Sequence, residues 1–275
     1  MTALPQPSSG QVAHGFAVLA RKIAQTRLTY RMSTVVTLVA SITSYGVFLL
    51  VWEAIYRENA APGPLTHDQM RAYLIVAFLV NSLLVMSVEW RFGQRLRAGL
   101  IASDLLRPLG FLTFQLAQAA GDLLVNSVYV VPLYLAGYWF AGSAILPAGA
   151  LAASLTLVSV GLAFLIAFGL SYLIMQAMFV LQSGYGVFFL RGSLHQVFSG
   201  LSAPLVMFPP ALRTVAEWLP FHHEIETPAR IWLGLVPWQE APRLLAGQAA
   251  WGLGLLAVGD LLFGAVMRRH QIQGG

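Results

Sequence analysis

The residue types best suited to chemistry lie in the polar run 222–226, which reads HHEIE. Imidazole and carboxylate groups bind zinc and transfer protons in many enzymes. This run, however, does not have the spacing of the helical HExxH zinc motif, and the adjacent His222 and His223 would not share one face of a helix. We therefore expect neither a metal site nor a catalytic site, and we interpret the run as a solvated external loop.

A second set of candidates consists of charged residues inside long apolar runs, where charge is costly and usually functional. Arg191 and Asp260 each lie about two helical turns from the same end of their runs. Their similar depth predicts an intramembrane ion pair. Alternatively, Arg191 extends its long side chain to the membrane surface. Asp122 lies near the edge of its run, where a charge would need no partner.

The lysine content excludes ATP binding by a conventional P-loop in this chain. A Walker A loop requires a lysine after a glycine-rich stretch. The only lysine is Lys22, in the sequence ARKIA, with no such glycines before it. The chain is thus not a conventional P-loop ATPase. It also has no cysteine, which excludes disulfides, thiolate metal sites and cysteine nucleophiles.

Composition indicates an integral membrane protein. Hydrophobic residues make up 57% of the chain and charged residues only 10%, against about 25% charged residues in soluble domains. The mean hydropathy is +0.70. In a soluble protein the net charge of +5 would point to nucleic acid. Here we attribute it to basic cytoplasmic loops, and we expect no nucleic-acid partner.

The apolar runs predict an all-α membrane protein with six transmembrane helices. The expected spans are Met32 to Trp52, Tyr73 to Val88, one within 109–140, one within 148–178, one beginning near Gly184, and Leu244 to Met267. Of the sixteen Lys and Arg residues, ten fall in the segments 11–31, 89–108 and 268–269, which lie on one side of the membrane in this arrangement. This asymmetry predicts that both termini are cytoplasmic.

The first 31 residues are expected to form a cytoplasmic tail with an N-terminal amphipathic interfacial helix, preceding a transmembrane domain over 32–275. One helical stripe is apolar and consists of Val12, Phe16, Leu19, Ile23 and Tyr30. Basic residues lie off that stripe, as in helices that rest on a membrane surface. The alternative is that this helix simply extends the first span into the cytosol.

The stretch 184–234 begins as an apolar helix and is then cut into short pieces by Pro204, Pro209-Pro210, Pro220 and Pro228. Each proline removes a backbone donor and disfavours helix before it. We expect short broken, re-entrant external helices between spans five and six. Transporters built from inverted repeats usually have matching broken helices in both halves, whereas we expect one only in the second half of this chain.

The segment 89–108, EWRFGQRLRAGLIASDLLRP, is expected to be a cytoplasmic loop with an apolar patch among charges. Such a patch suits docking into a groove of a soluble partner. The alternative is a basic loop that rests on anionic lipid head groups. The candidate docking residues are Leu100, Ile101, Asp104, Leu105, Leu106 and Arg107.

Three stretches carry a resemblance: FSG…P…FPPALRTVAEWLPF…ETPARIWLG, the loop ending DLLRPL, and the C-terminal RRHQIQGG. Together they resemble a six-span branch of the ABC-2 type permeases, the membrane subunits of bacterial ABC exporters. The resemblance implies a bacterial plasma (inner) membrane protein that is not itself an enzyme and binds no cofactor. ATP and Mg would bind to a separate P-loop ATPase subunit that contacts the segment 89–108.

The resemblance also implies a second permease subunit, identical or related, in a dimer within the membrane lipids. The Phe- and Met-rich spans suit a lipophilic or amphipathic substrate that is moved outward. Candidates for an external gate are Pro220, Phe221, Glu224 and Glu226. The alternative functions are a stand-alone secondary transporter and a membrane-embedded lipid-modifying enzyme, and the latter would need convergent acids, bases or metal ligands.

Overall fold

The computed structural model describes residues 9–29, 31–58, 63–105, 110–141, 145–181 and 185–270, and all regular elements in these ranges are helices. The all-α prediction is confirmed for this part of the chain. The helices are α1 Ser9–Thr29, α2 Arg31–Glu58, α3 His67–Leu84, α4 Val88–Arg97, α5 Ile101–Leu105, α6 Phe111–Ala141, α7 Ala150–Leu181, α8 Tyr185–Phe198, η2 Leu205–Met207, α9 Pro210–Trp218, η3 Pro220–His223, α10 Glu226–Trp232 and α11 Ala241–His270.

Four helical stretches of the described residues are long and apolar enough to cross a membrane. They are His67–Arg97, Phe111–Trp139, Ala150–Leu181 and Ala241–Arg268. The chain is thus a multi-pass membrane protein. The expected spans in α2 and α8 are not among the four, and α8 has 14 residues where about 20 are needed to cross. The count of six spans stays a prediction.

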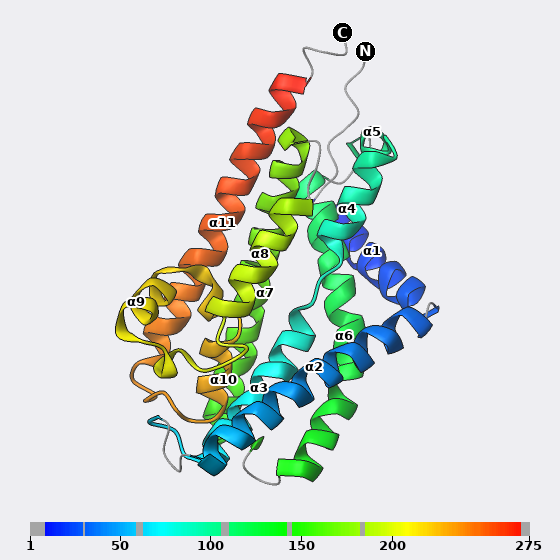
Figure 1. Cartoon of the computed structure of the whole chain (residues 1–275). Helices are drawn as coiled ribbons and strands as arrows, with labels where there is room; N and C mark the ends of the chain where they lie inside the picture. The colour runs from blue at the N-terminus through cyan, green and yellow to red at the C-terminus, as the bar shows by residue number, and fades with distance from the viewer. Residues whose placement is uncertain are drawn as a thin grey trace, which may run out of the picture.

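The long helices form a bundle in which α7 and α11 lie side by side (Figure 1). Two close approaches hold this pair together. A side chain at Gly169 of α7 would come within 2.7 Å of Leu255, and one at Gly259 of α11 would come within 2.4 Å of the Tyr172 ring. Glycine thus permits the tight packing that membrane helices use in place of a hydrophobic driving force.

The α3–α4 stretch lies at the centre of the bundle. Nearly every side chain from Met70 to Val80 is buried. Further along, Phe92 of α4 is 1% exposed and contacts the rings of Phe111 and Phe179, with centroids 6.0 and 5.0 Å away. Figure 1 places α4, α5 and the C-terminal end of α11 at one end of the bundle, and α9 and α10 toward the other. These ends are called here the α5 end and the α9 end.

The second predicted span was wrong in two respects. First, it is interrupted at Val85-Met86-Ser87, which are not helical, so the first half of the chain contains a broken helix although no proline is present. This interruption is called the α3–α4 break. Second, the helix resumes and runs to Arg97, and Glu89 is buried at 2% exposure. The expected loop 89–108 therefore begins inside the bundle.

Helix α1 packs across α6. The contact centres on Gly121, where a side chain would come within 2.8 Å of the Ala20 carbonyl oxygen. The expected apolar stripe is half-buried at Val12, Phe16, Leu19 and Ile23, whereas Arg21 and Lys22 are exposed. Tyr30 lies outside the described residues. The position of α1 at a membrane surface stays a prediction.

Residues 199–240, called here the broken segment, follow α8 and contain η2, α9, η3 and α10. Proline stands at the first position of α9 and of η3, where its missing N–H costs nothing. Side chains from α2 and α3 fix the start of the segment. Tyr73 donates to the Gly200 carbonyl at 2.8 Å, and Trp52 donates to the Ser202 carbonyl at 3.0 Å. Its depth in the membrane stays a prediction.

Candidate functional site

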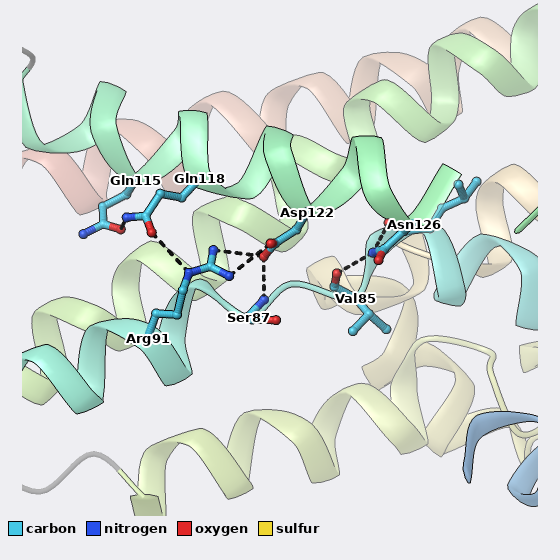
Figure 2. Close-up of polar contacts among 8 residues, drawn as sticks. Val85, Ser87, Arg91, Gln115, Gln118, Asp122 and Asn126 are labelled. Atoms are coloured by element: carbon cyan, nitrogen blue, oxygen red, sulfur yellow. Dashed lines mark hydrogen bonds and ion pairs between the residues drawn. The ribbon is translucent and has the colours of Figure 1, made fainter. Parts of the chain in front are cut away.

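The α3–α4 break is held by Asp122 of α6, as Figure 2 shows. One carboxylate oxygen of Asp122 accepts the Ser87 backbone N–H at 2.8 Å, just before α4 begins. Both carboxylate oxygens also pair with Arg91, each 3.0 Å from a terminal guanidinium nitrogen. Asp122 has no solvent exposure. A buried carboxylate thus satisfies a backbone donor that the break would otherwise leave without a partner.

Two neighbours of Asp122 on the same face of α6 complete this arrangement (Figure 2). The Asn126 side-chain amide donates to the carbonyls of Leu83 and Val85 at 3.1 and 2.7 Å, at the end of α3. The Gln118 side-chain carbonyl accepts from Arg91 at 3.1 Å. Residues 118, 122 and 126 are four positions apart and so lie along one helix face. This face replaces the backbone hydrogen bonds lost at the break.

A second group of charges lies just beyond the break and is called here the charge cluster: Glu89 of α4, Arg191 and His195 of α8, and Glu224 after η3. One terminal nitrogen of Arg191 is 3.1 Å from Glu89, and the other is 3.8 Å from Glu224. Glu224 is also 3.3 Å from His195 Nδ1. Three separate parts of the chain thus meet at one guanidinium.

The two carboxylates of the charge cluster are buried, whereas the Arg191 and His195 side chains are 21% and 18% exposed. Glu89 is 2% exposed and Glu224 is 1% exposed. Both oxygens of Glu89 and one oxygen of Glu224 have no aligned hydrogen bond within the part of the chain that the structure describes. Arg191 donates to the Ala167 carbonyl of α7 at 3.4 Å. Arg191 therefore supplies most of the positive charge that compensates the two buried carboxylates. Burying charged groups costs desolvation free energy, so the arrangement points to a functional role.

The expected pair of Arg191 with Asp260 is wrong. Among the described residues, the ion pairs of Arg191 are with Glu89 and Glu224, whereas Asp260 is exposed on α11. The prediction rested on similar depth in two spans. Depth alone does not determine which helices are neighbours, and both actual partners lie in segments that we expected to be loops.

The HHEIE run is not the solvated loop that we expected. Phe221, His223, Glu224 and Glu226 are each 7% exposed or less, because η3 packs between α7, α8 and α11. No group of residues that could hold a metal ion occurs in the described part of the chain. Pro220 is also buried. A gate role for these residues stays a prediction.

Burial shifts the pKa of three ionisable groups in the broken segment, Glu226, His223 and His222, and lowers the pKa of His222. It raises the pKa of Glu226 to about 7, against the opposing effects of the Leu205 backbone N–H, which donates to the carboxylate at 2.8 Å, and of Arg230. It lowers the pKa of His223 to about 3, and the neighbouring His222 adds to that shift. His223 Nδ1 lies 3.1 Å from the Thr227 hydroxyl oxygen. In this segment burial therefore favours the neutral form of each of these side chains.

At the α5 end, the expected docking residues divide into two kinds. Asp104 is 1% exposed and pairs with Arg95 of α4, 2.8 Å from one guanidinium nitrogen, and Ile101 is also buried. These two residues fix α5 to the bundle. Leu100 and Leu105 are 47% and 40% exposed. Leu106 and Arg107 lie outside the described residues. Among the expected docking residues that the structure describes, Leu100 and Leu105 are therefore the two exposed enough to contact a partner.

A cavity of about 570 Å³ lies between α2, α3 and α6. Its walls are mostly aliphatic and aromatic, including Leu49, Leu74 and Phe78. At one end Glu53 and His67 lie 2.7 Å apart. This cavity is thus a long apolar space with a polar end, and no residue of the predicted sites contributes to it.

Sequence reasoning missed the α3–α4 break, the burial of Glu89 and the role of Asp122. One signal was available. Gln118, Asp122 and Asn126 recur every four residues in an otherwise apolar helix, and a polar stripe of this kind in a span usually faces another polar element. The break itself has no local signal, because its residues are ordinary helix formers.

The comparisons with known proteins bear on the whole chain. A family model described as ABC-2 family transporter protein matches residues 29–274, whereas no curated protein matches the chain. The match includes the broken span, the charge cluster and the broken segment, and it confirms the resemblance seen in the sequence. This multi-pass membrane protein therefore belongs to the ABC-2 family of transporter proteins.

Proposed function

We propose that the chain is the permease subunit of an ATP-driven exporter, and that a separate P-loop ATPase hydrolyses ATP with Mg for it. Family membership supports the permease assignment. The observation that carries the partner assignment is the α5 end, where Leu100, just before α5, and Leu105, at the end of α5, are exposed. Full burial of a leucine contributes about 1.5–3 kcal/mol, so this pair, already partly buried, would supply part of the affinity for a soluble subunit.

The helices behind this surface are suited to transmit a force. The ion pair of Arg95 with Asp104 joins α5 to α4. The first turn of α4 is then held by Asp122, Arg191 and their partners. A movement of the docked partner would thus tilt α4 about the α3–α4 break, because the helix is interrupted there at Val85-Met86-Ser87.

This function orients the molecule. The α5 end would face the cytoplasm of a bacterium, with both termini on that side, and the broken segment would lie near the outer surface of the plasma membrane. A second permease subunit, identical or related, would pair with this one around the transport pathway. The excess of Lys and Arg in the segments 11–31, 89–108 and 268–269 supports this orientation.

The substrate that we propose is lipophilic or amphipathic. The cavity between α2, α3 and α6 supports this choice because about 570 Å³ of mostly apolar space falls in the range of small-molecule sites. Its polar end at Glu53 and His67 would suit the head of an amphipathic molecule. Stimulation of ATP hydrolysis in the reconstituted complex, screened with lipids, detergents and lipophilic drugs, identifies the class.

The partner assignment is tested by co-purification from native membranes. The double variant Leu100→Glu/Leu105→Glu should insert normally and lose the ATPase. The matched control is Leu212→Glu/Val215→Glu on α9, where both leucine and valine are also exposed but at the other end of the bundle. The control should retain the ATPase. Equal retention by both double variants would show that the docking surface lies elsewhere.

The two alternatives predict different results in the same experiment. A stand-alone secondary transporter or a lipid-modifying enzyme would purify without any P-loop ATPase, whichever variant is used. Lipid modification would further need convergent catalytic groups, and the buried carboxylates of the charge cluster are already paired with Arg191. Capture of an ATPase by the unaltered chain, and its loss in the α5-end variant, would exclude both alternatives.

A further inference from the structure

We propose that Arg191 is a positioning residue that couples the α5 end to the broken segment by binding carboxylates from both. This inference rests on the proposed function, since it supposes that an ATPase moves α4. Glu89 belongs to the first turn of α4, and Glu224 directly follows η3. Arg191 contacts the two carboxylates through different terminal nitrogens. Movement at one end therefore reaches the other through a single side chain.

The two contacts of Arg191 are unequal. The distance to Glu89 is 3.1 Å and that to Glu224 is 3.8 Å, beyond the range of a hydrogen bond. The guanidinium thus lies closer to the α4 carboxylate. A tilt of α4 that lengthens the Glu89 contact would shift the guanidinium toward Glu224, because the half-buried Arg191 side chain, 21% exposed, then has Glu224 as its remaining carboxylate partner. The contact between Arg191 and Glu224 would then shorten and pull η3 toward α8.

The surroundings of Glu224 allow such a change. One of its oxygens has no hydrogen bond within the described part of the chain, and its other contact is His195, one helical turn from Arg191 on α8. His195 is in turn 3.2 Å from the Asn81 side-chain oxygen of α3. Glu224 can therefore accept a further hydrogen bond from Arg191 without giving up an existing one.

The neighbouring carboxylate in the broken segment has a different role. Glu226 accepts the backbone N–H of Leu205 at 2.8 Å and lies 3.6 Å from Arg230, both within the same segment. It holds the segment together, whereas Glu224 faces the bundle. The position of Glu224 between η3 and α10 means that a pull on it moves both short helices, since Glu226 begins α10.

A purely structural clamp would make a different prediction. If Arg191 only stabilised the fold, its loss would lower the amount of folded protein and leave the response of the folded fraction to ATP unchanged. Coupling predicts that the folded protein still responds at α4 and no longer responds in the broken segment. The two readouts must therefore be measured separately in one complex.

The chain contains no cysteine, so paired spin labels can report both movements in the purified complex with its ATPase. One pair joins Gln94 of α4 to Leu253 of α11, and the other joins Val215 of α9 to Leu253. All three positions are exposed. In the unaltered chain we expect both distance distributions to change when ATP and vanadate are added.

In Glu224→Gln and in Arg191→Lys, the α4 distance should still change. The ratio of molecules with a moved α9 to those with an unmoved α9 should fall about 2- to 30-fold, which corresponds to the roughly 0.5–2 kcal/mol found for residues that carry coupling. Lysine keeps the charge but has one compact ammonium group, and so lacks the two separate terminal nitrogens with which Arg191 contacts Glu89 and Glu224. Glu217→Gln is the matched control, because Glu217 is an exposed carboxylate in the same segment, paired with Arg213.

Each outcome decides the question. Loss of the α9 response in both cluster variants, with the control unaffected, supports the coupling. A normal α9 response in Arg191→Lys and Glu224→Gln overturns it, even though the ATPase is bound and α4 moves. If the unaltered chain purifies without an ATPase, the proposed function itself is wrong, and the coupling is overturned along with it.

Discussion

Asp122 of α6 and Arg91 of α4 form a bidentate ion pair inside the bundle, with both nitrogen–oxygen distances at 3.0 Å. The same carboxylate accepts the Ser87 N–H at the α3–α4 break. One side chain thus joins a helix start to a basic residue one turn later. Helix starts favour a negative charge, so Asp122 stabilises α4 by its position as well as by its pairing.

Replacing Asp122 should therefore be costly. Asp122→Asn removes the negative charge that faces the half-buried Arg91, whose side chain is 28% exposed, so the loss should be about 1.5–3 kcal/mol, as for hydrogen bonds to charged groups. Thermal unfolding of the purified protein in detergent measures the loss. Asp68→Asn is the matched control, because the Asp68 side chain is 87% exposed, and such surface changes stay within about 0.5 kcal/mol. Equal melting temperatures for the two variants would refute the assignment.

The second prediction concerns Arg191 and Asp260. The sequence predicted that they lie at the same depth and pair, whereas in the structure Arg191 pairs with Glu89 and Glu224. Arg191→Gln should destabilise the fold by about 3–5 kcal/mol because it leaves two buried carboxylates without a cation. Asp260→Asn should leave the melting temperature nearly unchanged, since Asp260 is exposed on α11. A large loss in Asp260→Asn would instead restore the original pairing.

Hydropathy located the long helices because a transmembrane segment is a run of consecutive apolar residues. In lipid such a run forms a helix, since its backbone N–H and C=O groups must hydrogen-bond to one another. It did not reveal the α3–α4 break. The residues Val85-Met86-Ser87 contain neither proline nor glycine, and the stabilising Asp122 lies 35 positions downstream of Ser87. A break that depends on a distant side chain has no local pattern to be recognised by.

The charge cluster, too, could not be predicted from the local sequence pattern. The polar composition of HHEIE correctly marked a region of interest, but composition alone predicted exposure to solvent. The run is buried because Arg191, 33 positions before Glu224 in the sequence, supplies the compensating charge. Prolines, by contrast, marked the short helices of the broken segment well, since each proline acts on its own neighbours.

A third prediction tests how the broken segment is anchored. Gly200 has φ +83°, and a side chain there would come within 2.5 Å of the Tyr73 hydroxyl and 2.9 Å of Glu226. Gly200→Ala should therefore destabilise the protein by about 1–3 kcal/mol, from backbone strain and from the lost contact. Gly254→Ala is the control. Gly254 lies in α11 with open space around it, so alanine there should be neutral or stabilising.

Topology gives a fourth prediction. In the cysteine-free chain, Ala98→Cys at the α5 end should react with a membrane-impermeant maleimide only after cells are opened. Trp218→Cys on α9 should react in intact cells. Both positions are exposed, Trp218 at 79%. Reaction of position 98 in intact cells would reverse the orientation, and with it the proposed ATPase surface.

The last prediction follows from His223, whose pKa burial lowers to about 3 from an ordinary value near 6.5. Between these values the unfolded chain binds a proton that the folded chain does not. The stability from His223 is thus complete above about pH 6.5 and is lost as the pH falls toward 3. The slope approaches 1.4 kcal/mol per pH unit for one proton.

Hydrogen exchange of the broken segment, measured between pH 7 and pH 4 and corrected for the intrinsic rate, should show this loss as a difference between the unaltered chain and His223→Gln. The comparison is needed because Glu226, whose pKa burial raises to about 7, adds stability as the pH falls over the same range. His223→Gln removes the ionisable ring, so its segment should lose less protection over the same range. His14→Gln, at an exposed position of α1, should behave like the unaltered chain. If His223→Gln loses protection as steeply as the unaltered chain, other groups set the acid sensitivity, because only the His223 contribution has been removed.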